Sequence, residues 1–134
     1  MLRKFLAVTF LVVLSSTPAY ALFGRTKPIY NIVDAPITTG SGKTPTSEQI
    51  EQAFTNAAHI KGWSVEPGDA GALIASIHVR QHYAEIAMTH TDKTYSITYR
   101  DSKVLMYDGK EIHRNYNKWV QLLDEEFHRY LNRL

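Results

Sequence analysis

The stretch LIASIHVRQHYAEIAMTHTDKTYSITYRDSKVLMY, residues 73–107, decides the fold. Apolar and polar residues alternate along most of it, which is the period-two pattern of half-buried β-strands. Polar pairs interrupt the pattern at Gln81-His82, Asp92-Lys93 and Asp101-Ser102, where we expect two-residue turns. The stretch therefore predicts consecutive antiparallel strands that form a meander.

In the register that these turns set, the apolar side chains of all strands fall on one face of the sheet. The expected pairs on this face are Ile77 with Ile86 and Tyr99, Ala75 with Met88 and Ile97, Val79 with Ala84, Tyr99 with Val104, and Ile97 with Met106. A slip of one residue would carry a whole set of side chains to the other face. The agreement between the strands therefore supports the register.

The opposite face of the expected sheet carries charged and polar side chains, and we expect solvent to reach its charged end. Its residues are His78, Glu85, Arg100 and Lys103 in one cross-strand row, and Ser76, Ala87, Thr98 and Leu105 in the next. In this register His78 lies opposite Glu85 as a surface ion pair. Exposed tyrosines often carry binding surfaces. The candidate partner surface therefore consists of His78, Tyr83, Glu85, Arg100 and Tyr107.

Two amphipathic helices are predicted on either side of the meander in the sequence. Thr46 and Gln49 have the spacing of a capping box, and apolar residues follow at helical spacing. Gly62 is a natural C-terminal stop for this helix. The apolar stripe of the last helix comprises Ile112, Tyr116, Trp119, Val120, Leu123, Phe127, Tyr130, Leu131 and Leu134. Its polar side carries Asp124, Glu125 and Glu126, which we expect to be solvated.

Together these elements predict one α+β domain over residues 22–134. The expected architecture is an antiparallel meander sheet of four to five strands with two helices packed on one face, a two-layer sandwich. A further strand is predicted over Ile29–Ile37, and Pro36 confines it to an edge of the sheet. The sequence leaves open which edge this is. Such an edge could accept a strand from a partner, although Pro36 partly blocks it.

The first 21 residues have the pattern of a secretory signal peptide. Arg3 and Lys4 precede an apolar run over residues 5–14, and Ala19 and Ala21 are the small residues of an A-x-A cleavage site. The alternative is an uncleaved membrane anchor. A run of this length would rise only about 15 Å as a helix, half of a hydrocarbon core of about 30 Å. We therefore expect cleavage after Ala21, a periplasmic or secreted location, and no stable membrane anchor afterwards.

The charges of the expected mature chain balance. Arg3 and Lys4 are two of the 15 basic residues, so that 13 basic residues face 13 acidic ones in the rest of the chain. A nucleic-acid-binding domain that works by gross charge needs a basic excess, and nucleic acid is therefore not an expected partner. The chain has no cysteine, which excludes disulfides, a cysteine nucleophile, a cysteine zinc site and a lipoprotein anchor.

The segment ITTGSGKT, residues 37–44, resembles the phosphate-binding loop of P-loop ATPases in its final Gly-Lys-Thr. We expect a flexible polar linker instead, because Ile37 replaces the first glycine of that motif. Pro45 and Thr46 also place the helix start after the motif, whereas a phosphate loop runs directly into its helix.

The histidines are the only other candidates for chemistry: His59, His78, His82, His90, His113 and His128. No H-E-x-x-H motif and no helical i,i+4 pair brings them together, and we expect neither a metal site nor a cofactor. The chain also lacks the G-x-S-x-G and S-x-x-K motifs of serine nucleophiles. We therefore expect no enzymatic activity.

The last helix carries the pattern Y-N-x-W-V-x-x-L over residues 116–123, and the strand residues Tyr95 to Ser102 precede it. In these residues the chain resembles the C-terminal half of small exported bacterial proteins of unknown function, which are described as periplasmic proteins or as lipoproteins. This chain lacks the lipoprotein cysteine. The resemblance implies a location in the cell envelope and carries over no catalytic residue.

The favoured hypothesis is a non-enzymatic binding or accessory domain of the bacterial cell envelope, whose partner is an unknown envelope protein or small ligand. The alternative is a small envelope hydrolase or a metal-handling protein that uses histidines. The positions of His78, His82 and His90 discriminate between the two. Convergence on a carboxylate in a pocket favours the alternative, and dispersal over the molecule favours the binding domain.

Overall fold

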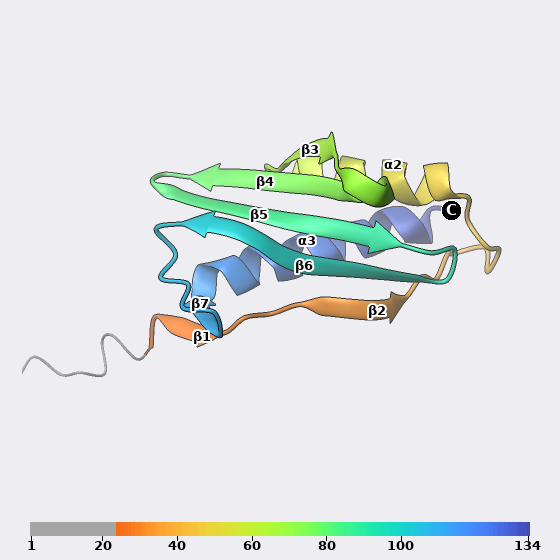
Figure 1. Cartoon of the computed structure of the whole chain (residues 1–134). Helices are drawn as coiled ribbons and strands as arrows, with labels where there is room; N and C mark the ends of the chain where they lie inside the picture. Colours follow the sequence, from red (N-terminus) through yellow and green to blue (C-terminus); the bar gives the residue numbers. More distant parts are fainter. Residues whose placement is uncertain (1–23) are drawn as a thin grey trace, which may run out of the picture.

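The computed structural model describes residues 24–134, which form two helices, a five-stranded sheet and a two-stranded sheet (Figure 1). The strands are β1 (Thr26–Pro28), β2 (Ile32–Pro36), β3 (Ser64–Pro67), β4 (Leu73–Val79), β5 (His82–His90), β6 (Thr94–Lys103) and β7 (Glu111–His113). The helices are α2 (Ser47–Ile60) and α3 (Arg114–Asn132), with a short 3-10 turn, η1, at Asp69–Gly71. The expected signal peptide, residues 1–21, lies outside the described residues.

The large sheet is antiparallel, with the strand order β2-β6-β5-β4-β3. Strands β3 to β6 follow one another as the predicted meander, and β2 adds to it at the β6 edge. Both helices pack on one face of this sheet, and β1 pairs with β7 below it (Figure 1). The predicted α+β fold with two helices on one face of an antiparallel sheet is confirmed. No helix within residues 24–134 is long and apolar enough to cross a bilayer.

The register between β5 and β6 confirms the expected pairing of Ile86 with Tyr99 and of Met88 with Ile97. The predicted turn at Asp92-Lys93 joins the two strands. The register between β4 and β5 differs from the prediction by two residues: Ile77 pairs with Ala84, Ala75 with Ile86, Leu73 with Met88 and Val79 with His82. A two-residue shift preserves the apolar face, which is why the core forms as expected.

The physical reason for this shift lies in the hairpin turn at Arg80 and Gln81. Two-residue hairpin turns require a positive φ at a central position. Arg80 adopts a φ of +58°, and the turn therefore forms one residue earlier than the polar pattern indicates.

The third predicted turn, at Asp101-Ser102, is wrong because β6 continues through it to Lys103. Val104 and Met106 therefore do not pair with Tyr99 and Ile97, and they are exposed instead. Leu105, expected on the open face, is buried in the core. After β6 the chain leaves the strand through Val104 and Met106, whose φ angles are +60° and +54°, and the alternation that the prediction assumed no longer holds there.

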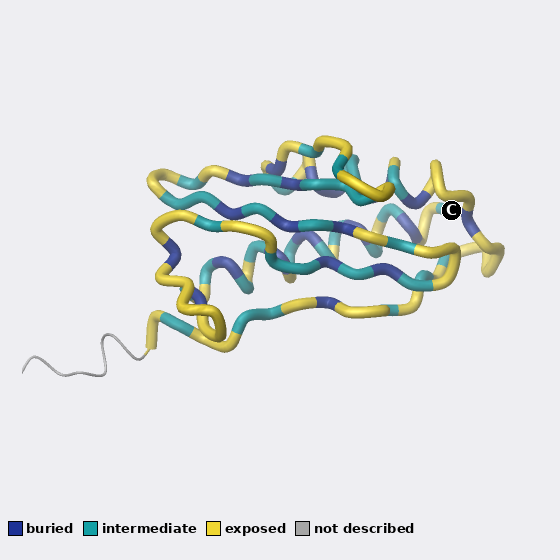
Figure 2. The backbone as a smooth tube through the Cα atoms, viewed as in Figure 1, coloured by how far each residue is buried: buried dark blue, intermediate teal, exposed yellow. Residues whose placement is uncertain are grey.

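The core lies between the sheet and the helices (Figure 2). Phe54 of α2 meets Phe127 of α3 edge-to-face, with ring centres 5.7 Å apart. The predicted stripe of α3 supplies the fully buried residues Tyr116, Val120, Leu123, Phe127 and Leu131. Ala53, Ala57 and Ala58 form most of the buried face of α2, and these small side chains allow the helix to lie close to its neighbours.

The ends of α2 follow the predicted signals. The Thr46 side chain accepts from the Gln49 N–H at 3.1 Å, and the Gln49 side chain accepts from the Thr46 N–H at 2.9 Å, which completes the capping box. At the other end Gly62 has a φ of +86°, and its N–H and that of Trp63 satisfy carbonyls of the last turn. The start of α3 differs from the prediction, because Ile112 belongs to β7 and the helix begins at Arg114.

Candidate functional site

Four of the five residues of the candidate partner surface meet on the face of the sheet that the helices leave uncovered. The Tyr83 hydroxyl donates to Glu85 Oε1 at 2.8 Å, and Arg100 Nε donates to Glu85 Oε2 at 2.9 Å. The rings of His78 and Tyr83 lie 4.7 Å apart, and Lys103 Nζ lies 5.6 Å from the centre of the Tyr83 ring. We call these residues, His78, Tyr83, Glu85, Arg100 and Lys103, the open-face cluster.

The strands explain how the open-face cluster forms. Tyr83 lies between His78 of β4 and Lys103 of β6 in one cross-strand row. The predicted ion pair of His78 with Glu85 is wrong, because Ser76 lies opposite Glu85 in the shifted register.

The bulge of β6 places Arg100 against Glu85. Glu85 pairs with Asp101 while the next residue, Ile86, pairs with Tyr99, so that Arg100 is the extra residue. Alternation already places Arg100 on the open face, and the bulge sets it beside Glu85, so that the guanidinium reaches the Glu85 carboxylate.

The cluster is chemically a set of paired donors and acceptors. Partial burial raises the pKa of the Tyr83 hydroxyl, and the hydrogen bond to Glu85 raises it further. The hydroxyl therefore stays protonated at neutral pH and donates its proton to the carboxylate. Glu85 accepts from both Tyr83 and Arg100, which leaves an ordered polar surface beside the neighbouring rings of His78 and Tyr83.

The structure does not bring Tyr107 to this cluster. Its ring stacks on Tyr99 with centres 4.1 Å apart, and Tyr99 in turn contacts Tyr116 of α3 at 5.8 Å. Tyr99 pairs with the buried Ile86 and shares its helix-covered face. Tyr107 therefore lies at the margin of the core and not on the open face.

Residues 37–44, which resemble a phosphate-binding loop, form an ordered segment rather than the expected flexible linker. Its backbone N–H groups are engaged: Ser41 N–H donates to the Leu134 carbonyl at 3.2 Å, Gly42 N–H to the Thr39 carbonyl at 3.2 Å, and Lys43 N–H to Ser41 Oγ at 3.3 Å. A phosphate loop needs such groups to point at its ligand. As predicted, α2 begins after the motif.

Gly40 shows how closely this segment packs. A Cβ atom on Gly40 would lie 2.1 Å from the carbonyl oxygen of Asn132, so that only glycine fits against the end of α3. Hollows of about 360 and 340 Å³ border the segment and are lined mainly by Thr, Lys and Pro side chains. The segment closes the end of the core rather than cradling an anion.

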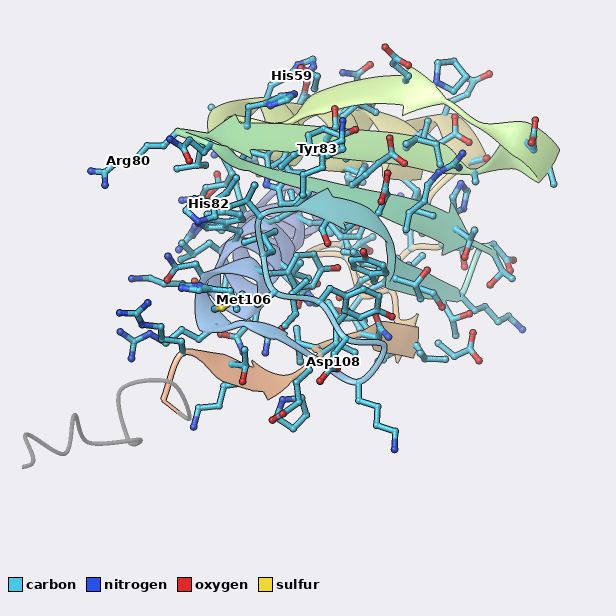
Figure 3. The ribbon with its side chains drawn as sticks, turned by 60° about the vertical axis from the view of Figure 1, so that its left-hand side comes forward. His59, Arg80, His82, Tyr83, Met106 and Asp108 are labelled. Atoms are coloured by element: carbon cyan, nitrogen blue, oxygen red, sulfur yellow. The ribbon has the colours of Figure 1, made fainter. Side chains whose placement is uncertain are left out.

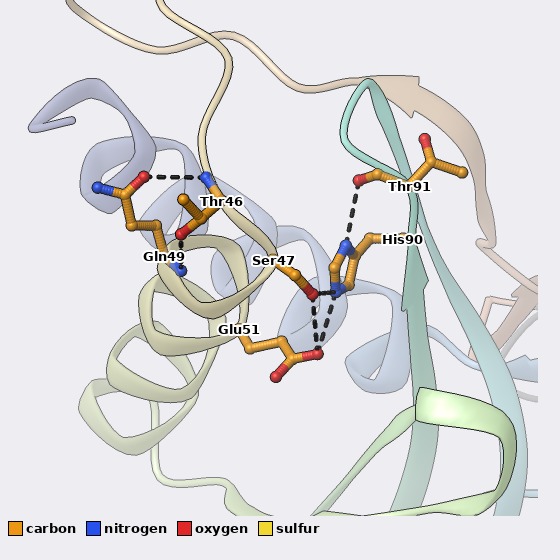
Figure 4. A network of polar contacts seen from close by, with 6 residues as sticks. All are labelled: Thr46, Ser47, Gln49, Glu51, His90 and Thr91. Atoms are coloured by element: carbon orange, nitrogen blue, oxygen red, sulfur yellow. Dashed lines mark hydrogen bonds and ion pairs between the residues drawn. The ribbon is translucent and has the colours of Figure 1, made fainter.

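His90 joins Ser47 and Glu51 in a contact that resembles a Ser-His-acid triad (Figure 4). Its Nε2 lies 3.5 Å from Ser47 Oγ and 3.2 Å from Glu51 Oε1, while its Nδ1 lies 3.1 Å from the Thr91 carbonyl. In a catalytic triad the acid binds the ring nitrogen opposite the serine. Here serine and acid share one nitrogen, and the contact ties the first turn of α2 to the end of β5.

A second polar contact joins β6 to α3. The hydroxyl of buried Tyr95 donates to Asp124 Oδ1, and His128 Nε2 lies 2.9 Å from the same hydroxyl. Burial and the Asp124 carboxylate raise the pKa of Tyr95 far above its usual range. The prediction that Asp124, Glu125 and Glu126 are all solvated is therefore wrong, because only Glu125 is exposed. The Glu126 carboxylate, like that of Asp124, is largely covered.

The remaining histidine contact joins His113 and His82. His113 caps α3, with its Nδ1 accepting from the Asn115 N–H at 3.1 Å, and its ring centre lies 5.9 Å from that of His82. Burial lowers the pKa of His113, and the positive charges of His82, Arg114 and Arg25 lower it further. Within residues 24–134 no three His, Asp or Glu side chains converge in a way that could hold a metal ion.

In comparisons with known proteins, no family model, curated protein or solved structure matches the chain.

Proposed function

We propose that the chain is a non-enzymatic binding domain of the bacterial cell envelope that recognises a partner through the open-face cluster. The observation that carries this proposal is the mutual ordering of Tyr83, Glu85 and Arg100 on a sheet face without a covering helix. Side chains that are already held in place lose less conformational entropy when a partner binds. Tyr and Arg are also the residue types that most often dominate binding energy.

The positions of the histidines favour this proposal over a hydrolase or a metal-handling protein. His78 lies on the open face, whereas His82 and His90 lie at opposite ends of β5 on the helix-covered side. His90 and His113 each complete a structural contact, with α2 and with the start of α3. The dispersal of His78, His82 and His90 supports a binding domain over a site built from histidines.

The open face of the sheet is better suited to recognition than either of its edges. β2 carries Pro36 and a bulge in which Asp34 adopts a φ of +50°, and β3 is only four residues long and ends at Pro67. Such features prevent strand addition at exposed edges. We therefore assign recognition to the open face rather than to the edge strand Ile32–Pro36.

Site-specific photo-cross-linking in the envelope of the producing cell tests this proposal. A photoreactive residue at position 78 samples the open face, and one at the exposed position 52 on α2 is the matched control. We expect a discrete cross-linked product from position 78 that is absent from position 52 and is lost when Arg100→Ala is added. A product from position 52 alone would contradict the proposal.

A further inference from the structure

One end of the molecule gathers cations that have no acidic partner. Arg25, Arg80 and Arg114 are exposed there, and none of them takes part in an ion pair among residues 24–134. The backbone brings them together, since the Arg114 N–H donates to the Arg25 carbonyl at 2.8 Å and Thr26 pairs with His113. Arg80, in the β4–β5 turn, precedes His82, whose ring contacts that of His113.

Two apolar side chains are exposed at the same end. Val104 is 62% exposed and Met106 47%, while Leu105 between them is buried and its carbonyl accepts from the His113 N–H at 2.8 Å. In Figure 3 the labelled Arg80, His82 and Met106 all lie at this end of the sheet. We call Arg25, Arg80, Arg114, Val104 and Met106 the cationic end.

The backbone holds these apolar side chains outward in an unfavourable conformation. Val104 has a φ of +60° and Met106 a φ of +54°. This left-handed region is disfavoured for L-residues, and most of all for a β-branched one such as valine. Glycine or asparagine would adopt the same positive φ angles with less strain.

Arg114, like the positive φ angles of Val104 and Met106, is locally unfavourable. It is the first residue of α3, where the positive end of the helix dipole favours an acidic side chain, and the first turn contains none. Val104 and Met106 remain exposed, and the Arg114 side chain makes no ion pair among residues 24–134. Local rules that a chain breaks without a structural gain usually mark a functional surface.

We infer that the cationic end rests on an anionic phospholipid surface. Arg25, Arg80 and Arg114 would face the headgroup phosphates, and Val104 and Met106 would enter the boundary between headgroups and acyl chains. Cations interspersed with exposed apolar side chains are the composition of interfacial membrane-binding surfaces.

This inference is independent of the proposed recognition site and compatible with it. The strands of the large sheet run from the cationic end to the opposite end, where β5 turns into β6 and α3 finishes (Figure 1). A molecule standing on its cationic end therefore directs its strands away from the membrane. The open face then stands upright, accessible to a partner in the same compartment.

Co-sedimentation of the exported chain with lipid vesicles tests the inference. The vesicles contain either equal parts of phosphatidylglycerol and phosphatidylcholine or phosphatidylcholine alone. The variant Arg25→Ser/Arg80→Ser/Arg114→Ser removes three cations from the cationic end. The variant Lys43→Ser/Lys93→Ser/Arg133→Ser removes three from the opposite end and is the control with the same net charge.

We expect the chain to bind the anionic vesicles and not the neutral ones. The first variant should bind on the order of 100-fold more weakly, and the control should lose no more than a few-fold. Equal losses in both variants, equal binding to neutral vesicles, or displacement by inorganic phosphate at constant ionic strength would each overturn the inference.

The apolar side chains provide a test in which impaired folding cannot explain the result. Val104→Asn/Met106→Asn places residues that tolerate a positive φ in the loop, so that the variant should unfold at the same or a higher temperature. Its binding to anionic vesicles should nevertheless weaken on the order of tenfold, because apolar burial is lost. Unchanged binding by a folded variant would contradict the role assigned to Val104 and Met106.

Discussion

At the scale of single residues, His113 links the helix cap to pH. Its Nδ1 accepts a backbone hydrogen bond, and burial, His82, Arg114 and Arg25 together lower its pKa. The unfolded chain therefore takes up a proton at His113 at a higher pH than the folded chain does. The free energy of unfolding should consequently fall as the pH drops below 6.5, the ordinary value for histidine, toward the folded pKa.

The variant His113→Asn isolates this contribution, because asparagine caps a helix without titrating. Urea unfolding at a series of pH values should show the wild type losing stability relative to the variant below pH 6.5. Parallel pH profiles for the two chains would show that His113 is not the titrating group.

The strain at Val104 is a second property of a single residue. Val104→Asn should raise the free energy of unfolding by about 1 kcal/mol, because asparagine adopts a positive φ with less strain. Val33 in β2 is the control position, because it is also exposed but does not have a positive φ. Val33→Asn should give no gain, and chemical denaturation of both variants measures the difference.

At the scale of elements, the alternation of β5 assigns its residues to two opposite faces. Glu85 belongs to the open face and Ile86 to the core. Glu85→Gln should therefore lower the free energy of unfolding by no more than about 1 kcal/mol. Ile86→Gln should lower it by more than about 3 kcal/mol, since it leaves a buried amide without partners. A larger loss from Glu85→Gln than from Ile86→Gln in thermal denaturation would mean that the face assignment is inverted, and equal losses would contradict it.

The contact between residues 38–45 and α3 predicts a difference between two glycines. Gly40→Ala forces a backbone clash with Asn132, whereas Gly42, with a φ of +73°, has open space around its Cβ direction. Gly42→Ala should cost only its backbone strain of about 1 kcal/mol, and Gly40→Ala should cost more. Hydrogen exchange at the Ser41 amide, which bonds to Leu134, should accelerate in Gly40→Ala alone.

The elements also show how far the sequence predicts this molecule. Alternation along β4 to β6 and helical spacing in α2 and α3 give the fold class, because each pattern reports which side faces the core. The capping box at Thr46 and the stop at Gly62 are local signals and are predicted correctly. The turn at Arg80 is missed because its positive φ is unusual for arginine. The bulge at Arg100 is missed because the alternation of side chains does not mark an extra residue.

The candidate site is predicted in part for the same reason. Residue alternation places His78, Tyr83, Glu85 and Arg100 on one face, and the structure brings them into contact. Tyr107 is misplaced because it follows the turn that does not exist. The contacts of His90 with Glu51 and of Tyr95 with Asp124 join residues far apart in sequence, and they depend on how the helices lie on the sheet.

At the scale of the whole molecule, charge balance conceals an uneven distribution. The 13 basic and 13 acidic residues beyond the expected leader cancel in number, yet Arg25, Arg80 and Arg114 share one end. We propose that this end orients the molecule on a membrane and that the open face recognises a partner. Binding of the exported chain to anionic vesicles should weaken steeply with added salt, because exposed charges are screened within about 8 Å at physiological ionic strength.

The proposal that the chain is a non-enzymatic binding domain acting through its open face can be tested by native mass spectrometry. The protein is isolated for this from the envelope of exporting cells. We expect a polypeptide that starts at Leu22, carries no metal and bears a partner mass. That mass should be lost in Arg100→Ala and retained in the control Gln52→Ala. One equivalent of metal, or a partner mass that survives Arg100→Ala, would contradict a non-enzymatic binding role for the open face.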